Sequence, residues 1–188
     1  TVEQAIGVWT TGGPYGGYVE QVMVHPQIST TVYALGSGAG LFRSANGGEG
    51  WDLVAGASSH VGHMALKPDA PQTLVWNDGS GLYRSPDEGV TWRKLITGPI
   101  GGFGYAPSSP DRLYAFVSGT VRLSHDNGQS WDPPGTGLPT IEGRALAVDP
   151  VTWTTAYVGT LDGRIYKTSD GGGSWHALNT AALPDAEI

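Results

Sequence analysis

The chain of 188 residues contains no cysteine. It therefore has no disulfide and no thiolate chemistry, and cysteine usage gives no information on its redox compartment. No run of residues has the length and apolar character of a membrane span, and the first residues, TVEQAIGVW, have neither the basic start nor the apolar core of a signal peptide. These absences predict a chain without membrane insertion.

Charged residues are scarce, at 14% of the chain, and Lys and Arg together number only ten. The net charge is −7 and the pI is near 5.0. A nucleic-acid backbone or an anionic membrane would not be attracted electrostatically to such a chain. The composition therefore predicts no nucleic-acid partner.

Uninterrupted amphipathic runs of helix length are also missing, whereas Gly (30 residues) and Pro (13 residues) are abundant. This combination is typical of short strands joined by many turns. Seven Trp and eight Tyr exclude a disordered chain, and the length suffices for one domain with a buried core. The composition thus favours an all-β domain.

The chain does contain a repeated unit of eight residues, which is clearest in SPDEGVTW at residues 85–92. The pattern of Ser/Thr, any residue, Asp/Asn, any residue, Gly, any residue, Ser/Thr/Gly and Trp recurs at residues 44–51, 124–131 and 168–175. The copies begin 41, 39 and 44 residues apart, which indicates a repeat architecture. The residues that define the unit are Asn46, Asp87, Asp126 and Asp170, with Trp51, Trp92, Trp131 and Trp175.

Each residue type in the unit has a physical reason to occupy a tight turn. The Asp or Asn side chain can accept hydrogen bonds from amides of its own turn. Gly suits a backbone position with positive φ, and the Trp starts a strand and buries its ring over the turn. A calcium array is the alternative, but each unit offers only one or two oxygen ligands where calcium needs several. We therefore predict structural turns.

The unit resembles the Asp-box, or bacterial neuraminidase (BNR), repeat of the β-propeller superfamily, and its four copies extend over nearly the whole chain. The resemblance implies an all-β propeller in which each unit joins the third and fourth strands of a four-stranded antiparallel blade. Sialidases, xyloglucanases, photosystem II assembly factors and sortilin-like receptors share the repeat. The resemblance therefore implies a fold and leaves the activity open.

The chain divides into four full blades within a single propeller domain or segment, residues 1–188. We expect the blades at residues 19–54, 61–96, 101–134 and 143–179, with edge pieces at 8–11 and 182–188. The inner strand of each blade ends in Pro, where a missing amide costs least. Unpaired edges leave three alternatives: a segment of a larger propeller with missing blades, a homodimer that closes one ring, or a small ring closed by the terminal strand.

The resemblance also indicates which face binds ligands. Antiparallel order places the repeat turns on one face and the other strand connections, with the starts of the inner strands, on the opposite face. Propellers usually bind ligands on that opposite face. The residues expected there are Tyr15, Tyr18, Glu20, His60, His63, Asp78, Glu142, Arg144 and Asp162, and Tyr15, Tyr18, His63 and Arg144 are candidate ligand-binding residues.

Glycoside hydrolysis is the sharpest enzymatic hypothesis, because it needs two carboxyl groups that flank one bond. Glu20, Asp78 and Asp162 are the candidates. The early Arg-Ile-Pro motif of sialidases is absent. Residues 16–44 resemble the first blade of xyloglucanases, in which an Asp follows the second strand; this chain has Ser37 there, and Asp78 stands at the equivalent place one blade later.

Two further residue types, His and Trp, are candidate ligand-binding groups. His60 and His63 have a spacing that could hold a metal on a helix, but they lie in a loop without further ligands, so neither a metal nor another cofactor is predicted. Trp76 and Trp153 break the repeat. Either is a candidate platform for a sugar or a protein partner; the alternative for Trp76 is that it fills a gap beside Val75.

These patterns favour a non-catalytic binding or scaffold propeller that recognises a protein or glycan partner. The alternative is a glycoside hydrolase, similar to a xyloglucanase or a sialidase, or a glycan-binding module of a larger secreted enzyme. An extracellular or periplasmic location is implied by the family resemblance.

Overall fold

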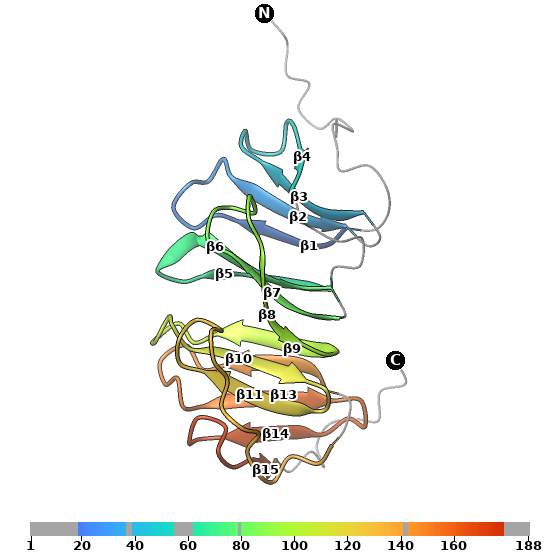
Figure 1. The fold of residues 1–188 in the computed structure, drawn as a ribbon, viewed down its shortest axis with the longest axis vertical. Coiled ribbons are helices and arrows are strands. Elements are labelled where there is room, and N and C mark those ends of the chain that lie inside the picture. Colours follow the sequence, from blue (N-terminus) through green and yellow to red (C-terminus); the bar gives the residue numbers. More distant parts are fainter. Residues whose placement is uncertain (1–18, 37–38, 55–61, 79, 141–142, 179–188) are drawn as a thin grey trace, which may run out of the picture.

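The computed structural model describes residues 19–36, 39–54, 62–78, 80–140 and 143–178 (Figure 1). Blade 1 contains β1 (Val19–Val24), β2 (Val32–Gly36), β3 (Gly40–Ser44) and β4 (Asp52–Leu53). Blade 2 contains β5 (His63–Lys67), β6 (Ala70–Asn77), β7 (Gly81–Ser85) and β8 (Arg93–Thr97). Blade 3 contains β9 (Ile100–Tyr105), β10 (Leu113–Val117) and β11 (Thr120–Ser124). Blade 4 contains β12 (Gly143–Val148), β13 (Ala156–Thr160), β14 (Ile165–Thr168) and β15 (His176–Ala177).

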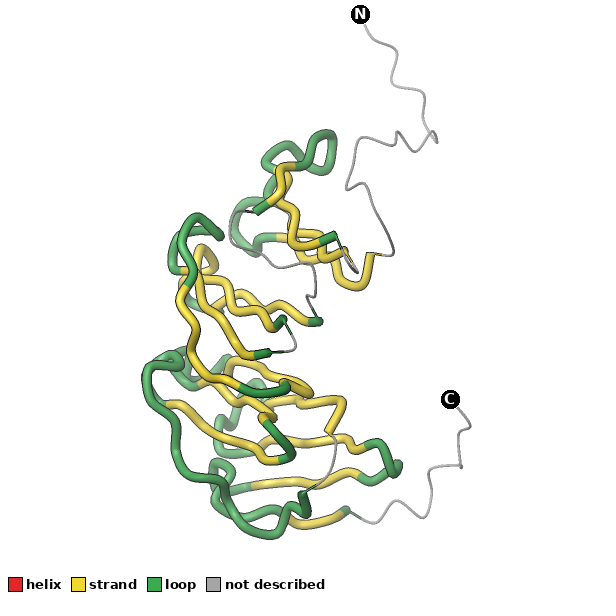
Figure 2. Tube along the Cα trace, turned by 45° about the vertical axis from the view of Figure 1, so that its right-hand side comes forward, coloured by secondary structure: helices red, strands yellow, loops and turns green. Residues whose placement is uncertain are grey.

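Each sheet is an antiparallel meander in which strands that follow one another in the sequence pair. The sheets succeed one another along a curved row (Figure 2), which is the arrangement of propeller blades. The prediction of an all-β propeller is confirmed. No helix in the described ranges is long and apolar enough to cross a membrane. The predicted edge pieces, 8–11 and 182–188, lie outside the described residues.

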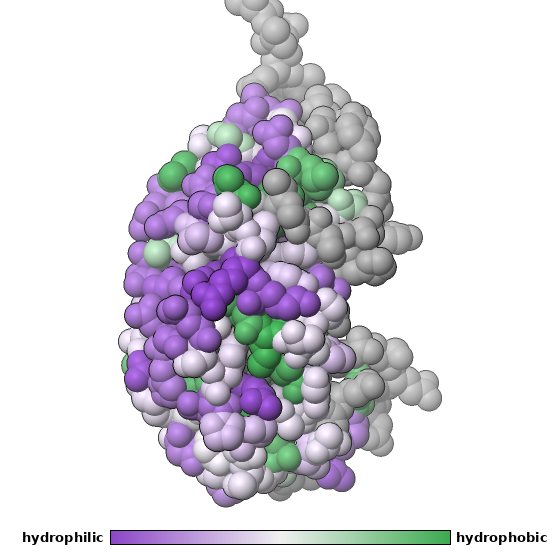
Figure 3. Space-filling view, viewed as in Figure 1, coloured by the Kyte–Doolittle hydropathy of each residue, from purple (hydrophilic) through white to green (hydrophobic). Residues whose placement is uncertain are grey.

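The hydrophobic core is divided among the three junctions between neighbouring blades. Because side chains alternate along each strand, both faces of an inner blade can carry apolar residues to its two neighbours. The three clusters centre on Tyr33 and Trp76 between blades 1 and 2, on Val75 and Phe103 between blades 2 and 3, and on Tyr114 and Trp175 between blades 3 and 4. The surface is mainly polar in the view of Figure 3, with an apolar strip near its middle and further apolar patches towards the blade 1 end.

Blade 3 lacks the fourth strand that the sequence predicts after Trp131. The amide of Asp132 still donates to the carbonyl of Leu123 at 2.8 Å. Pro133 and Pro134 follow, and because proline has no amide hydrogen the ladder stops there. The prediction of a complete third blade was therefore wrong in this strand, although the two prolines were visible in the sequence.

After the prolines the chain crosses to blade 4. The amide of Thr136 donates to the carbonyl of Gly173 at 3.0 Å, and the amide of Trp175 donates to the carbonyl of Thr136 at 2.9 Å. A Cβ at Gly135 would stand 1.9 Å from the carbonyl oxygen of Gly172, so only glycine allows this approach. The crossing ties blade 3 to the repeat turn of blade 4.

The repeat turns are closed by side chains, as the sequence predicts. In blade 3 the buried hydroxyl of Ser124 accepts the amide of Gly128 at 2.7 Å and donates to Asp126 at 2.8 Å. Asp126 also accepts the amide and the hydroxyl of Ser130, at 2.8 and 2.6 Å. Corresponding bonds from the first hydroxyl and the Asp or Asn recur in the other three turns. These Asp side chains therefore serve their own turns.

Candidate functional site

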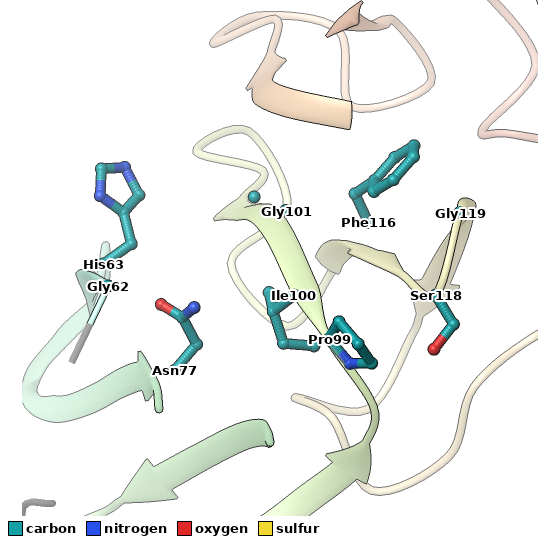
Figure 4. Close-up of a pocket in the computed structure, with 10 residues that line it drawn as sticks. Gly62, His63, Asn77, Pro99, Ile100, Gly101, Phe116, Ser118 and Gly119 are labelled. Atoms are coloured by element: carbon teal, nitrogen blue, oxygen red, sulfur yellow. The ribbon is translucent and has the colours of Figure 1, made fainter. Parts of the chain in front are cut away.

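A cleft lies between blades 2 and 3 on the face opposite the repeat turns (Figure 4). Its volume is about 460 Å³, within the range of ~300–1,000 Å³ typical of small-molecule sites. It is formed by the start of β5, the end of β6, β9 and the turn between β10 and β11. The residues that line it are Gly62, His63, Asn77, Pro99, Ile100, Gly101, Gly102, Phe116, Ser118 and Gly119. This is the face on which the sequence predicts ligand binding.

Two glycines at equivalent positions explain why the cleft is open. Six residues before the Pro that ends each inner strand stand Glu20, Gly62, Gly101 and Arg144, in blades 1 to 4. The register of the ladder skips Glu20, Gly101 and Arg144, which are therefore β-bulge residues. A β-bulge leaves its extra residue unpaired and changes the direction in which that residue's side chain points. Between blades 2 and 3 neither position carries a side chain, so the space is left free.

Asn77, His63 and Ser118 are the polar side chains that border this space. Asn77 is only 6% exposed, and its Oδ1 has no hydrogen-bond partner. The ring of His63 meets that of Phe103 edge-on, with 6.0 Å between the ring centroids. Ser118 and Gly119 have φ of 49° and 83° and form a tight hairpin turn that presents the serine. Among the described lining residues there is no Asp, Glu, Lys or Arg.

Asp78 directly follows Asn77 and closes the turn after β6. It accepts the amide and the hydroxyl of Ser80, at 2.9 and 2.8 Å. Burial raises the pKa of Asp78, but hydrogen bonds from Ser80 and Tyr83 and the charge of Lys94 outweigh this and leave the pKa below its ordinary value. The side chain is therefore a carboxylate at neutral pH. It fits a base or nucleophile, whereas a general acid needs a raised pKa.

Asp162 occupies the turn after β13 in blade 4 and is exposed. The hydroxyl of Thr160 donates to it, and Nε of Arg164 lies 3.3 Å from its Oδ2. These two contacts, Thr160 first, lower the pKa of Asp162. Asp162 therefore also fits the base of a carboxylate pair and not the acid, and blade 3 lies between its blade and that of Asp78. Glu20 is exposed on β1 in blade 1.

Several predicted site residues fall outside what the structure describes. Tyr15, Tyr18, His60 and Glu142 are among them, and Arg144 is described only through its backbone in β12. In the described ranges, no three His, Asp or Glu side chains gather as metal ligands would.

Trp76 is a core residue, so the structure corrects its prediction as a ligand platform. It is 1% exposed and stacks on Tyr83, with 5.3 Å between ring centroids and 25° between planes. Trp92 approaches edge-on at 5.4 Å. The burial follows from the alternation of β6, which directs Trp76 into the junction with blade 1 and Val75 into the junction with blade 3.

Trp153 lies on the other face of the molecule, beside the repeat turns of blades 3 and 4. The guanidinium of Arg112 stacks over its ring at 3.9 Å from the centroid, and His125 meets it edge-on at 6.1 Å. The hydroxyl of Tyr114 donates to the carbonyl of Trp153 at 2.9 Å. The ring therefore joins blades 3 and 4, and one of its faces is already covered.

Asn77, Ile100, Phe116 and Ser118 were not singled out from the sequence. For Asn77 a signal existed, because the residues that take its place in the other blades are Leu35, Phe116 and Gly159. A buried amide at a position that is otherwise small or apolar is a departure from the repeat. The other three residues needed the junction between blades to be known.

No protein-family model matches this chain. It is 26% identical over 195 residues to the oligoxyloglucan-reducing end-specific xyloglucanase of Emericella nidulans. The matched region covers 87% of this chain and 24% of that enzyme. It is 28% identical over 151 residues to the xyloglucanase of Hypocrea jecorina, with 74% of this chain and 18% of that enzyme covered. The chain thus spans about a quarter or less of the length of these two enzymes.

Among solved structures, the chain is similar to an ancestral GH74 enzyme, with a TM-score of 0.72 and 21% identity over 87% of this chain and 24% of the other. At this identity the similarity establishes the propeller fold alone. The sequence relatives favour the glycoside hydrolase alternative over the non-catalytic binding or scaffold role predicted from the sequence.

Proposed function

We propose that this chain is part of a xyloglucanase-like glycoside hydrolase and contributes part of its polysaccharide-binding face. The cleft between blades 2 and 3 is the observation that supports the proposal, because it lies on the face where ligand binding is predicted and its described lining contains no Asp, Glu, Lys or Arg. The two xyloglucanases matched by the sequence support the substrate class, xyloglucan. We further propose that the four repeat turns are Asp-boxes and that the protein is exported.

Within this proposal, Asp78 is the catalytic carboxylate. Its lowered pKa keeps it ionised, as a base or nucleophile requires. It follows Asn77, a lining residue of the cleft, directly in the chain.

The test uses the purified chain, soluble xyloglucan and the release of reducing ends. We expect the wild type to bind xyloglucan in affinity electrophoresis and Asp78→Asn to abolish any hydrolysis while binding persists. Asp52→Asn is the matched control, because Asp52 is an exposed carboxylate at the start of β4, next to a repeat turn. Binding without hydrolysis in the wild type supports the glycan-binding module of a larger enzyme. Absence of binding to xyloglucan and to other β-glucans overturns the proposal.

A further inference from the structure

Blades 1 and 4 stand at the two ends of the row, so each has one sheet face without a neighbouring blade in the described part of the chain (Figure 1). On blade 1, Val22 and Leu53 belong to one line of residues across the sheet, and Val24 follows on the same face. These three side chains are 61%, 61% and 53% exposed. On the free face of blade 4, Leu178 is 40% exposed. Aliphatic side chains that gather on an exposed sheet face indicate an interaction surface.

The free face of blade 4 repeats the pattern with which blade 1 packs on blade 2. The residues of blade 1 in that junction include Tyr33, Leu41 and Val54. The residues at the same repeat positions of blade 4 are Tyr157, Ile165 and Leu178. On the receiving side, Val22 and Val24 take the places that Met64 and Leu66 have in blade 2. The two free faces are therefore the two halves of one junction.

The side chain three residues after a repeat Trp packs on the glycine of the next repeat turn. A Cβ at Gly89 would lie 2.1 Å from Cγ1 of Val54, and a Cβ at Gly128 would lie 2.5 Å from Cδ1 of Leu95. Each of these contacts joins one blade to the next, and each needs a glycine. Leu178 stands at the same distance after the last repeat Trp, on the free face of blade 4.

A cation just before the repeat turn makes a second contact with the next blade. Arg43 forms an ion pair with Glu88 at 2.6 Å, and Arg84 donates to the carbonyl of Asn127 at 2.5 Å. Both partners are the fourth residue of the next turn, and both have a φ of 59°. Lys167 has the position of these two arginines in blade 4.

The first repeat turn presents the counterparts of both contacts. Gly48 takes the place of the packed glycine, and among the described residues only Trp51 of the same turn would lie within 4 Å of a Cβ there. Gly47 takes the place of the residue that the cation reaches, and its φ of 75° lies in the same left-handed region. Leu178 and Lys167 at one end of the row thus match this turn at the other end.

We propose that the free face of blade 4 packs on the free face of blade 1 of a second copy, in the manner in which blade 1 packs on blade 2. Leu178 of one copy then packs on Gly48 of the other, and Lys167 donates to the carbonyl of Gly47. Because the row is curved (Figure 2), two copies placed head to tail make this contact twice and close one ring. The contact is independent of the proposed function, since none of its residues lines the cleft between blades 2 and 3.

The test measures the mass of the purified chain by light scattering over a range of concentrations. We expect pairs of chains in the wild type. Leu178→Lys at one end, and Val22→Lys combined with Val24→Lys at the other, should each weaken the pairing at least about tenfold, because a charge would be buried in the contact. Leu161→Lys is the matched control, since Leu161 is 54% exposed in the turn after β13, and it should leave the pairing unchanged.

Mixing the variants distinguishes a head-to-tail contact from pairing through the same face. The unchanged blade 4 face of the Val22 and Val24 variant meets the unchanged blade 1 face of Leu178→Lys, so an equimolar mixture should form pairs that neither variant forms alone. Pairing that Leu178→Lys leaves intact overturns the proposal, because blade 1 faces would then contact each other. A mass of one chain at every concentration in the wild type also overturns it and leaves further blades of a longer protein as the occupants. Masses that grow beyond two chains overturn the closed ring.

Discussion

At the scale of single residues, the buried hydroxyl at the start of each repeat turn organises the eight residues that follow. Ser44, Ser85, Ser124 and Thr168 are all fully buried. Each accepts a turn amide four residues later and donates to the Asp or Asn two residues later. A buried group that satisfies two partners is more costly to remove than an exposed one.

We predict that Ser124→Ala lowers the free energy of unfolding by about 1–3 kcal/mol, because the buried amide of Gly128 loses its acceptor. Ser124→Thr should be close to neutral, since blade 4 has Thr168 at this place. Ser130→Ala, on the exposed side of the same turn, should change the value by roughly 0.5 kcal/mol or less. Urea denaturation followed by Trp fluorescence measures all three. Equal losses in Ser124→Ala and Ser130→Ala would contradict the assignment.

The turn carboxylates predict a dependence of stability on pH. Hydrogen bonds from the hydroxyl and amide of Ser130 lower the pKa of Asp126 from 3.8 to about 2. A group whose pKa is depressed in the folded state stabilises it above the unfolded pKa, and this stabilisation is lost as the pH falls from about 4 towards 2. Asp87 and Asp170 are shifted in the same direction by Thr91 and Ser174.

We therefore expect the melting temperature to fall below pH 4, and Asp126→Asn to make that fall shallower. Asn46 already takes the Asp position in blade 1, where its Oδ1 accepts the amide of Gly50 at 2.9 Å without titrating. Thermal unfolding followed by circular dichroism between pH 2 and 6 gives the melting temperatures of the wild type and of Asp126→Asn. An unchanged slope in Asp126→Asn would argue against a folded-state origin of the pH dependence.

At the scale of elements, polar side chains tie blade 1 to blade 2 and blade 2 to blade 3. On β1, the side-chain Nε2 of Gln21 donates to the backbone carbonyl of Met64 on β5 at 2.9 Å. The side-chain Oε1 of Gln21 accepts the backbone amide of Met64, also at 2.9 Å. Nearer the repeat turns, Arg43 and Glu88 form an ion pair at 2.6 Å, and Arg84 donates to the carbonyl of Asn127 at 2.5 Å. The polar ties lie near the ends of strands whose middles pack apolar residues.

We predict that Gln21→Ala weakens the junction of blades 1 and 2 by about 1–2 kcal/mol, because the amide and the carbonyl of Met64 both lose partners. Hydrogen exchange at the amide of Met64 should become faster. Gln21→Glu keeps the acceptor but loses the donor, so the exchange rate of the Met64 amide in this variant should lie between those of the wild type and Gln21→Ala. Unchanged protection at Met64 in Gln21→Ala would count against the contact.

At the scale of the whole molecule, the blade 1 end of the curved row differs from its middle. Val22 and Val24 of β1 are 61% and 53% exposed, whereas Met64 and Phe103, at the position of Val22 in blades 2 and 3, are 2% and 5% exposed. In blades 2 and 3 this face is covered by the preceding blade. An apolar sheet face of this kind calls for a partner sheet.

We therefore expect the chain to self-associate at high concentration through the face of Val22 and Val24. Val22→Lys combined with Val24→Lys should shift the light-scattering mass towards one chain, because charges would be buried in the contact. Val90→Lys is the control, since Val90 is 72% exposed in a repeat turn. A mass of one chain at every concentration in the wild type would contradict the expectation. Further blades of a longer protein would cover the same face.

The sequence alone determined what is settled within a short span of residues. The eight-residue turns followed from Ser, Asp, Gly and Trp at fixed spacing, because their hydrogen bonds close within the unit. The four-blade order followed from the period of the turns and the alternation of the strands. Even the missing strand of blade 3 was encoded locally, by Pro133 and Pro134.

The tertiary structure decided what depends on contacts between blades. Trp76 and Trp153 stood out equally in the sequence, yet neighbouring blades bury the first and cover one face of the second. The bonds of Gln21 join residues 43 positions apart, which no local pattern reveals. The cleft exists because Gly62 and Gly101, from different blades, both line it without side chains. Asn77 lines the same cleft, which only the packing of blades 2 and 3 reveals.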